Sequence, residues 1–528
     1  LTNISPNHTE HGNNYGIGDQ LDIACNSKGC TFHSKRSSES NSLPLRLFDE
    51  DIYKYPPTLI FGTVDKFASF ANKVSNKTEE RNADSRRLVG KGYGGARLSE
   101  RDVLPPELII QDELHLLLGP LGTSVGLFEK SIDKLCTYTN ENNQKIKPKI
   151  VTSTATTRNT DKQVFALFNR RTEIFPKQGI FCDDSFFAFY KRKKTNVDEY
   201  ASKRKYVGLL PIGKTQVWMQ LRLASITLTH RLKYLKENFT IDKLFENPEV
   251  SDELKQVFNY YHTVLGYYNS LKDVGKTQSQ LSHYLPGDVT YVIKNTIPWS
   301  FVDKFIRKEK EIMDSELTGR LKGEEVKTNL ADIEKKWELV SKKNGNYFLN
   351  GDNPPEFIIA TNMISVGIDV SRFNTMIISS MPRNIAEYIQ ASSRVARDED
   401  GIVFTIHHPF RSRDISHYQK FKEFHEKFYS YVEPISVTPF ASKALDRYLA
   451  MYVVVLVRHN IDGLMNNEDA VNINNDKIKE IEKMIKADLL EILSNSKKLE
   501  KYLSEDRTYS VKSSIDGIIS SEEIEDVE

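Results

Sequence analysis

The sequence predicts an α/β protein in which two parallel sheets follow one another along the chain. Apolar runs of strand length recur, each is followed by a helical stretch, and acidic, hydroxyl or small residues stand where the runs end. The clearest examples are ELIIQDELHLLLGPLG, KIVTSTATTRN, TVLGYYNS, EFIIATNMISVGIDV, NTMIISSM and GIVFTIHH. Functional groups of such folds lie at the carboxyl ends of the strands, so these ends are the places to look for chemistry.

The chain divides into four predicted segments: a first α/β domain at 1–185, a basic and aromatic helical linker at 186–255, a second α/β domain at 256–410 and a helical C-terminal region at 411–528. Near the start of the first domain, TLIF at 58–61 predicts a short buried strand. Near the end of the chain, apolar residues at helical spacing predict a helix over 476–493, capped by Asp476.

Composition excludes several classes of protein. Hydrophobic residues make up 39% of the 528 residues and charged residues 27%, which is ordinary globular usage and excludes a disordered or collagen-like chain. The longest apolar run, AMYVVVLV, falls far short of the ~18 residues of a membrane span, so we expect no membrane contact. Four cysteines and the lack of a leader pattern predict the reducing cytoplasm.

Charge alone does not identify a partner. Lys and Arg number 73 against 72 for Asp and Glu, a net charge of +1. Any contact with nucleic acid must therefore come from local basic surface.

Two carboxylates stand at the end of the first clear strand. Asp112 and Glu113 directly follow LIIQ, so both project from its carboxyl end. Two acids there suit a site in which Asp112 holds Mg²⁺ and Glu113 deprotonates the water that attacks a γ-phosphate. An acidic turn that caps a helix is the alternative for such a pair standing alone.

Two arginines and a glutamine recur late in the second domain. Gln390, Arg394 and Arg397 in QASSRVAR fall at i, i+4 and i+7, which predicts that they share one helical face. Two guanidiniums on one face suit a polyphosphate, because Arg keeps its charge and donates in a fork that matches phosphate oxygens. A solvated, salt-bridged helix surface is the alternative.

The ordered set GTVDKF, DELH, STATTR, ATNMISVGIDV and QASSRVAR resembles the motifs of superfamily 2 helicases, in which two RecA-like domains clamp ATP between them. DELH resembles the DExH motif II. The resemblance narrows to the DrmA family of helicase subunits from bacterial DISARM antiphage systems through IIQDELHLLLGPLGTSVGLFE, MPRNIAEYIQASSRVAR and VTPFASKALDRYL. It extends from about residue 50 to 460 and implies a fold of two RecA-like parallel-sheet domains in tandem, with ATP and Mg²⁺ as cofactors.

The resemblance assigns roles to the residues of the first domain. It implies that Asp112 and Glu113 serve Mg²⁺ and water and that His115 couples the ATP state to the next motif. A zinc ligand is the competing role for His115, but no second His or Cys lies at ligand spacing on that element. Ser153 and Thr154 match the residues that link the two domains.

The resemblance also assigns residues of both domains to ligands. Thr63 and Thr361 match residues that contact nucleic-acid phosphates, although either could simply cap a turn or helix. The remaining matches concern the nucleotide: Gly367, Asp369 and Gln390 as binding residues, and Arg394 and Arg397 as arginine fingers.

One motif of the family is not found where the resemblance requires it. No phosphate-cradling G-x-x-x-x-G-K-[ST] lies between Leu1 and Pro57, and we expect it upstream of residue 1. The chain alone is therefore predicted to hydrolyse ATP poorly. A literal match, GLLPIGKT at 208–215, could hold phosphate on Lys214 and Thr215. It comes after STATTR and its first Gly lies inside an apolar run, so we interpret it as a chance match.

Other features have two interpretations each. Cys25 and Cys30, with His33 nearby, are either half of a zinc site or free thiols. The stretches GKGYGGAR and FYKRKK either stack on single-stranded nucleic acid or are solvated linkers. The histidines His407, His408, His417 and His425 fit no standard metal set, and Cys136 and Cys182 indicate ordinary thiols.

The sequence therefore predicts an ATP-dependent helicase or translocase in the cytoplasm, acting on nucleic acid, with DNA and a DrmB-like protein as the partners that the resemblance implies and antiphage defence as its role. A nucleic-acid-binding scaffold without hydrolysis is the alternative, and a P-loop enzyme centred on Lys214 is the third candidate. DNA against RNA, polarity, unwinding against translocation and oligomeric state are not readable from the sequence.

Overall fold

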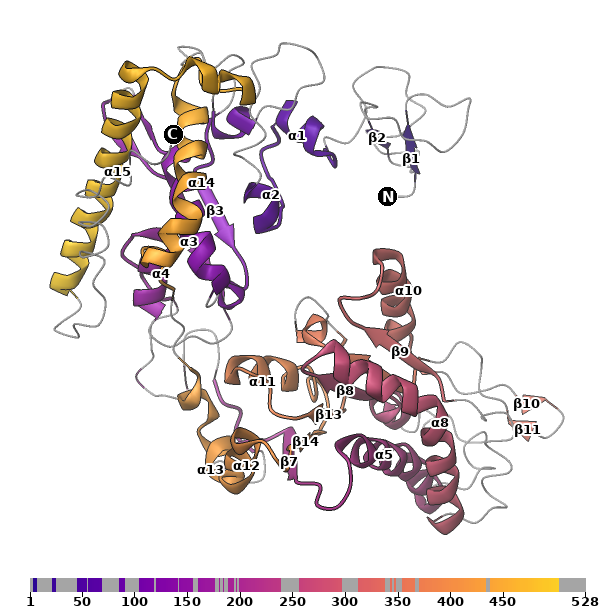
Figure 1. The fold of residues 1–528 in the computed structure, drawn as a ribbon. Helices are drawn as coiled ribbons and strands as arrows, with labels where there is room; N and C mark the ends of the chain where they lie inside the picture. Colours follow the sequence, from indigo (N-terminus) through magenta and orange to yellow (C-terminus); the bar gives the residue numbers. More distant parts are fainter. Residues whose placement is uncertain are drawn as a thin grey trace. The chain divides into compact units, whose positions relative to one another are not determined.

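The computed structural model describes the chain in pieces, and every structural statement below concerns these residues. They are 3–6, 21–24, 45–54, 56–68, 85–90, 104–117, 120–140, 142–154, 160–175, 180, 184, 189–193, 196, 199–238, 256–296, 312–337, 342–343, 346–347, 354–365, 370–433 and 437–502. The chain forms two compact units (Figure 1). Unit 1 contains Leu1–Glu173 and Pro434–Glu528, and unit 2 contains Ile174–Glu433.

The strands of unit 1 include a parallel pair, β3 (Leu108–Gln111) and β6 (Lys149–Thr152). The two strands are in register from Leu108 opposite Lys149 to Gln111 opposite Thr152. Their apolar side chains are only partly covered, since Ile110 is 67% exposed. Among the described residues, β3 and β6 therefore form a two-stranded sheet, and the polar residues predicted for the site follow these two strands.

The predicted strand at 58–61 is wrong. Residues 56–63 form no helix or strand, and Phe61 is 87% exposed. An apolar run becomes a strand only where a partner strand pairs with it, and no described residue pairs with this one. The predicted helix after it begins at Val64 as α2 (Val64–Ala68).

Three long helices form the main apolar core of unit 1: α3 (Pro120–Cys136), α14 (Ser442–Asn460) and α15 (Asn475–Tyr502). Leu127 of α3, Tyr452 of α14 and Leu489 of α15 belong to one buried cluster. The predicted helix at 476–493 is confirmed as part of α15. Its cap is Asn474 rather than Asp476, because Asn474 Oδ1 accepts the backbone N–H of Lys477 at 3.0 Å.

Short elements complete unit 1. They are β1 (Asn3–Pro6), β2 (Leu21–Ala24), α1 (Asp49–Lys54), η2 (Ser85–Val89), η4 (Leu114–Leu116), β4 (Tyr138–Thr139), β5 (Lys145–Ile146), α4 (Thr160–Phe168) and η7 (Asn467–Asn472). A second apolar cluster joins η4, α3 and α4 through Leu114, Val125 and Leu167.

Unit 2 is built on a six-stranded parallel sheet in the order β7-β14-β13-β8-β12-β9. The strands are β7 (Arg204–Leu209), β8 (Val264–Tyr268), β9 (Asp314–Leu317), β12 (Phe357–Ala360), β13 (Thr375–Ser379) and β14 (Gly401–Ile406). The predicted α/β class with parallel sheets is confirmed.

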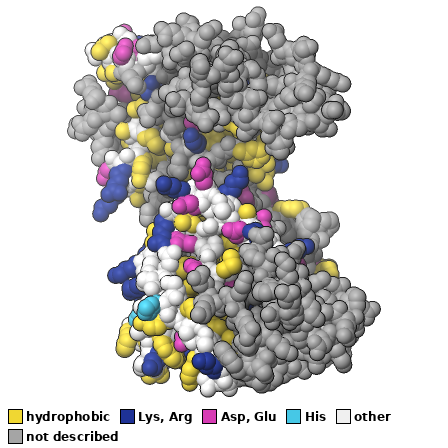
Figure 2. Space-filling model, turned by 90° about the vertical axis from the view of Figure 1, so that its right-hand side faces the viewer, with side chains coloured by type: hydrophobic (Ala, Val, Ile, Leu, Met, Phe, Trp, Pro, Cys, Tyr) yellow, Lys and Arg dark blue, Asp and Glu magenta, His cyan; other side chains and the backbone are white. Residues whose placement is uncertain are grey.

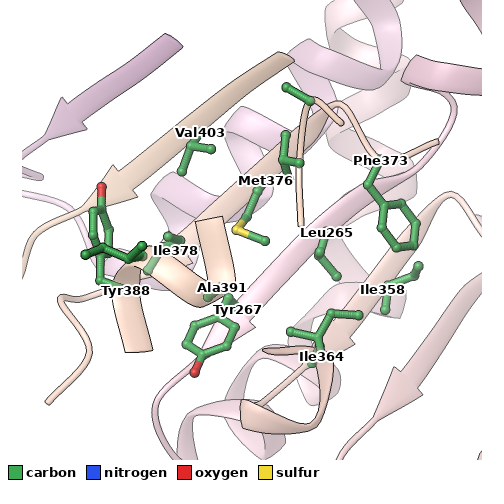
Figure 3. Packing of buried hydrophobic residues seen from close by; sticks show 14 of the residues in the cluster. Leu265, Tyr267, Ile358, Ile364, Phe373, Met376, Ile378, Tyr388, Ala391 and Val403 are labelled. Atoms are coloured by element: carbon green, nitrogen blue, oxygen red, sulfur yellow. The ribbon is translucent and has the colours of Figure 1, made fainter. Parts of the chain in front are cut away.

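Helices cover both faces of this sheet, which is why its central strands are continuous apolar runs. On one face α5 (Gln216–Asn238) and α8 (Leu271–Thr296) cover the side chains that include Val264 and Ile359. On the other face α10 (Gly323–Glu334) and α11 (Ile385–Ser392) cover those that include Leu265, Ile358 and Met376. Figure 3 shows these strand residues beside Tyr388 and Ala391 of α11.

The remaining elements of unit 2 are short. They are β10 (Lys342–Lys343), β11 (Asn346–Tyr347), η5 (Asn362–Ser365), α12 (Ser412–Gln419), α13 (Phe421–Glu426) and η6 (Phe428–Tyr431). No helix in the described ranges combines the length and the apolar character that crossing a bilayer demands.

The predicted domain boundaries stay predictions, but the structure adds two facts about them. The segment predicted as a linker, 186–255, contributes the edge strand β7 and the helix α5 to the sheet of unit 2. Residues 434–528 of the predicted C-terminal region group with unit 1. On the face drawn in Figure 2, cationic and acidic side chains are interspersed, as a net charge of +1 leads one to expect.

Candidate functional site

The predicted DELH and STAT residues of unit 1 lie together at the carboxyl ends of β3 and β6. Ser153 follows β6, and its Oγ donates a hydrogen bond to Asp112 Oδ1. The backbones also meet, because Ser153 N donates to Gln111 O at 3.0 Å and Leu114 N donates to Ser153 O at 2.9 Å. The carboxyl ends of β3 and β6 are therefore joined by hydrogen bonds, one of which is accepted by the Asp112 carboxylate.

Glu113 is held by the histidine of the same motif. His115 Nδ1 lies 3.1 Å from Glu113 Oε2, and the His115 side chain is 6% exposed against 28% for Glu113. Glu113 has φ 53° and ψ 48°, a left-handed conformation that costs a non-glycine residue roughly 1–2 kcal/mol. The turn thus directs Glu113 away from the path of the strand and against a buried imidazole.

The buried acid Glu129 of α3 contacts the carboxyl end of β3, and the sequence did not identify it. Gln111 Nε2 donates to Glu129 Oε1 of α3 at 3.0 Å. Burial raises the pKa of Glu129 to about 7, against a lowering from Gln111 and Lys130. The adjacent Lys130 donates to Ala166 O at 2.9 Å. The signal in the sequence was a Glu-Lys pair that directly follows the apolar residues VGLF of α3.

The other predicted residues of unit 1 are near this turn. Thr154 is partly buried, and its Oγ1 has no hydrogen-bond partner among the described residues. Thr63 is exposed and its carbonyl accepts from Lys66 N at 3.0 Å, which starts α2. The next residue, Val64, packs against the cluster that contains Leu114, so α2 lies against the same turn.

The prediction that Gln390, Arg394 and Arg397 share one helical face is wrong. The helix α11 ends at Ser392, so Gln390 is helical and buried, whereas the two arginines follow in turns and are partly buried. Ala396 between them has φ 58°, which breaks helical spacing.

Arg204 of β7 explains where the helix ends. Its guanidinium donates to Val395 O at 2.7 Å and to Ser393 O at 3.4 Å. These carbonyls follow the last helical turn and would otherwise lack partners. Arg204 was not identified from the sequence, because it lies nearly two hundred positions earlier in the segment predicted as a linker.

Thr361 is buried directly after β12, where its N–H donates to Leu317 O at 3.2 Å. Its carbonyl accepts from Ile364 N at 3.1 Å, so the residue starts the turn η5. Gly367 and Asp369 lie outside the described residues, as do Cys25, Cys30, His33, Cys182 and most of GKGYGGAR.

The P-loop-like pattern at 208–215 begins in the last two residues of β7 and ends just before α5. Gly208 is inside β7, and a Cβ there would come 2.6 Å from the Phe421 ring, so packing accounts for this glycine. Lys214 Nζ lies 5.3 Å from the centroid of the Trp218 ring. Thr215 Oγ1 accepts from Trp218 N at 3.1 Å and so caps α5. Each residue has a structural explanation that needs no phosphate.

The thiol and imidazole residues form no metal site in the described ranges, where no group of three His, Cys, Asp or Glu residues is placed to hold an ion. Cys136 is buried, and burial raises the pKa of its thiol to about 12. His407 is fully buried, and burial lowers its pKa to about 4.

The acidic turn suits a hydrated magnesium ion. Asp112 is exposed, and its Oδ1 accepts both from Ser153 Oγ and from Glu113 N at 2.9 Å. No hydrogen bond within the described residues uses Oδ2, so an oriented carboxylate oxygen remains available. Mg²⁺ usually keeps several waters and takes one or two carboxylates, which this arrangement offers.

Solved structures with a related fold include the helicase MrfA bound to DNA, at a TM-score of 0.41 and 13% identity over 66% of this chain and 37% of that one. The Mycobacterium smegmatis helicase Lhr bound to ssDNA and AMP-PNP has a TM-score of 0.39 and 12% identity, over 78% of this chain and 40% of Lhr. Likeness at this level supports no inference about function.

Sequence similarity is stronger. The chain is 34% identical over 481 residues to the DISARM protein DrmA of Bacillus paralicheniformis, covering 88% of this chain and 39% of DrmA. It therefore spans well under half of that relative's length. Residues 278–399 match the family described as the helicase conserved C-terminal domain. These matches confirm the predicted resemblance: the chain is similar to DrmA over most of its own length, and residues 278–399 are similar to the C-terminal domain of helicases.

Proposed function

We propose that this chain supplies the ATP-hydrolysing and strand-contacting residues of a helicase or translocase that acts on DNA. The observation that carries the proposal is the bond from Ser153 to Asp112 at the paired ends of β3 and β6, with Glu113 against buried His115. It links two separate motifs of the helicase pattern through one carboxylate.

In this proposal Glu113 takes the proton from the water that attacks the γ-phosphate. A base must lie within hydrogen-bond reach of that water and be held in place, and the contact with His115 at 3.1 Å holds the Glu113 side chain. His115 is buried, so it can pass a change at Glu113 on to the packed residues of the turn.

Asp112 would hold Mg²⁺ through water, and the ion would neutralise charge that develops on the phosphate oxygens. Gly367, Asp369 and Gln390 would bind the nucleotide, and Arg394 and Arg397 would act as arginine fingers. Ser153 and Thr154 would pass the nucleotide state to the rest of the protein, since Ser153 bonds directly to Asp112.

Thr63 and Thr361 would contact phosphates of the bound strand. Each stands directly before a short helical turn. DNA as the substrate, a DrmB-like protein as partner and a role in antiphage defence follow from the resemblance to DrmA and belong to the proposal.

The test is ATP turnover by the natural full-length protein with single-stranded DNA present. Replacing Glu113 by Gln should lower turnover at least about 100-fold, the range expected for losing a general base. Binding of the non-hydrolysable analogue AMP-PNP should persist, because Gln keeps the shape of the side chain.

Glu107→Gln is the matched control. Glu107 is an exposed carboxylate at the opposite end of β3, where it accepts from Tyr138 OH at 2.7 Å. Turnover in that variant should stay near the wild-type value. Unchanged turnover in Glu113→Gln would remove Glu113 from its role. A wild-type protein that turns over no ATP would instead favour a nucleic-acid-binding scaffold without hydrolysis.

A further inference from the structure

The carboxyl edge of the unit 2 sheet carries exposed apolar side chains at the end formed by β7 and β14. Ile212 is 84% exposed, Trp218 41% and Phe410 88%. None of them belongs to the helicase motifs of the sequence. Large apolar side chains that gather on an exposed surface mark a place where something binds.

Ile212 and Phe410 lie in two loops that start side by side, and Trp218 lies in the first turn of α5, which follows the first of these loops. His407 N donates to Leu209 O at 2.8 Å, so the chain leaves β14 and β7 as neighbours. Figure 1 shows the two strands adjacent, with the loop from β7 running to α5. The first turn of α5 is fixed there as well, because Gln216 Nε2 donates to Ile406 O at 3.1 Å.

Both aromatic residues are held by local bonds. The N–H of Trp218 donates to Thr215 Oγ1 at 3.1 Å, and the N–H of Phe410 donates to His408 Nδ1 at 3.1 Å. Rings presented on a fixed backbone lose less entropy on binding than rings on a loose one.

Cationic residues lie beside Trp218 in space and beside Phe410 in the sequence. Lys214 Nζ lies 5.3 Å from the Trp218 ring, and Arg411 directly follows Phe410. Farther along the same edge, Arg383 follows β13 and Lys272 follows β8. All four are exposed, and none forms an ion pair with another described residue.

The acids of this edge are already engaged. Asp414 is 3% exposed and accepts from Met381 N at 3.0 Å. Glu387 accepts from Tyr267 OH at 2.6 Å, and Asp273 accepts from Ser270 Oγ at 2.7 Å. Asp414, which follows β14, is buried, so the exposed charged side chains named at the β7–β14 end are the cations Lys214 and Arg411.

We propose that Trp218 and Phe410 form a stacking platform for bases of single-stranded nucleic acid, with Lys214 and Arg411 contacting its phosphates. The inference rests on the proposed function and extends the strand path beyond Thr361. β12 and β7 are separated by four strand spacings, about 19 Å along the edge. Exposed rings accompanied by cations suit bases and phosphates better than they suit an apolar protein face.

The test measures binding of the natural full-length protein to an oligodeoxythymidylate of about 20 nucleotides and to an abasic strand of equal length. The double variant Trp218→Ala, Phe410→Ala should raise Kd for the first probe about tenfold or more, as the loss of base stacking predicts. Kd for the abasic probe should not change, because that strand offers nothing to stack.

Two further variants separate stacking from other effects. Trp218→Phe should keep the affinity, because it restores an aromatic ring. Lys214→Ala with Arg411→Ala should reduce the slope of log K against log salt by about 1.4, or 0.7 for each phosphate contact. Tyr284→Ala is the control, since Tyr284 is 55% exposed on α8, about 20 Å along the helix from this edge.

The outcomes distinguish the platform from the proposed function. Wild-type binding with an unchanged Kd in the Trp218 and Phe410 double variant would overturn the platform and leave the proposed function standing. An equal loss for both probes would also overturn it, because stacking cannot act on an abasic strand. A wild-type protein that binds neither probe would overturn both.

Discussion

At the residue scale, the strand that ends in Asp112 is supported by Glu129, an acid with little access to water. Burial raises the pKa of Glu129 from 4.5 to about 7. The folded protein therefore holds this proton more tightly than the unfolded chain. The contribution of Glu129 to stability is fully present below pH 4.5 and is lost as the pH rises to about 7.

This linkage predicts the effect of Glu129→Gln. The variant keeps an oxygen that can accept from Gln111 but cannot ionise, so it should match the wild-type Tm near pH 4.5. Above pH 7 its Tm should be about 5 °C higher than that of the wild type. Thermal unfolding of both proteins across this pH range is the measurement.

The difference in Tm between the two proteins removes the effect of all other titrating groups, because the proteins differ only at position 129. A Tm difference that is the same at every pH would show that the Glu129 carboxyl ionises in the folded protein as it does in the unfolded chain.

Residues with characteristic chemistry could be predicted from the sequence, but the residues that hold them in position could not. Asp112 and Ser153 were predicted as members of two motifs, and the structure brings them into contact. Gln111 and Glu129 were missed. Their hydrogen bond exists only because α3 lies next to β3 in the fold, and neither residue is distinctive in the sequence.

At the element scale, the turn after α11 depends on Arg204 of the edge strand β7. Its guanidinium binds two carbonyls of the segment that carries Arg394 and Arg397. The positions of both proposed arginine fingers therefore depend on a residue from another element.

Arg204→Met should lower ATP turnover by up to about 100-fold, because a misplacement of catalytic groups by about 1 Å has that effect. Circular dichroism should be unchanged, since the backbone bonds between β7 and β14 do not use this side chain. Turnover and the spectrum are measured on the full-length protein. Lys205→Met, an exposed neighbour on the same strand, should turn over ATP normally, and equal turnover in both variants would refute the positioning role.

Strands with a continuous apolar pattern could be predicted from the sequence. Strands whose formation depends on a neighbouring strand could not. The runs that form β8, β12, β13 and β14 are apolar throughout because both faces of the sheet are covered. β7 was missed, because its Arg and Lys residues give an edge strand the character of a linker. TLIF at 58–61 was predicted as a strand on pattern alone, and strand formation requires a neighbour.

At the scale of the whole molecule, the residues proposed to act on ATP come from both compact units. Asp112 and Glu113 belong to unit 1, whereas Gln390, Arg394 and Arg397 belong to unit 2. Each unit presents its groups at the end of a parallel strand or just after a helix that packs on the sheet. If the proposal holds, neither unit hydrolyses ATP without the other.

The most direct test of this claim is a double-mutant cycle on ATP turnover by the full-length protein, comparing Glu113→Gln, Arg394→Ala and the combination. We expect Arg394→Ala to lower turnover about 1,000-fold, as removal of an arginine finger does. The double variant should be no slower than the slower single variant, because groups acting on one transition state are not additive. Wild-type turnover in Arg394→Ala, or losses that multiply in the double variant, would contradict the proposal that Glu113 and Arg394 act on one transition state.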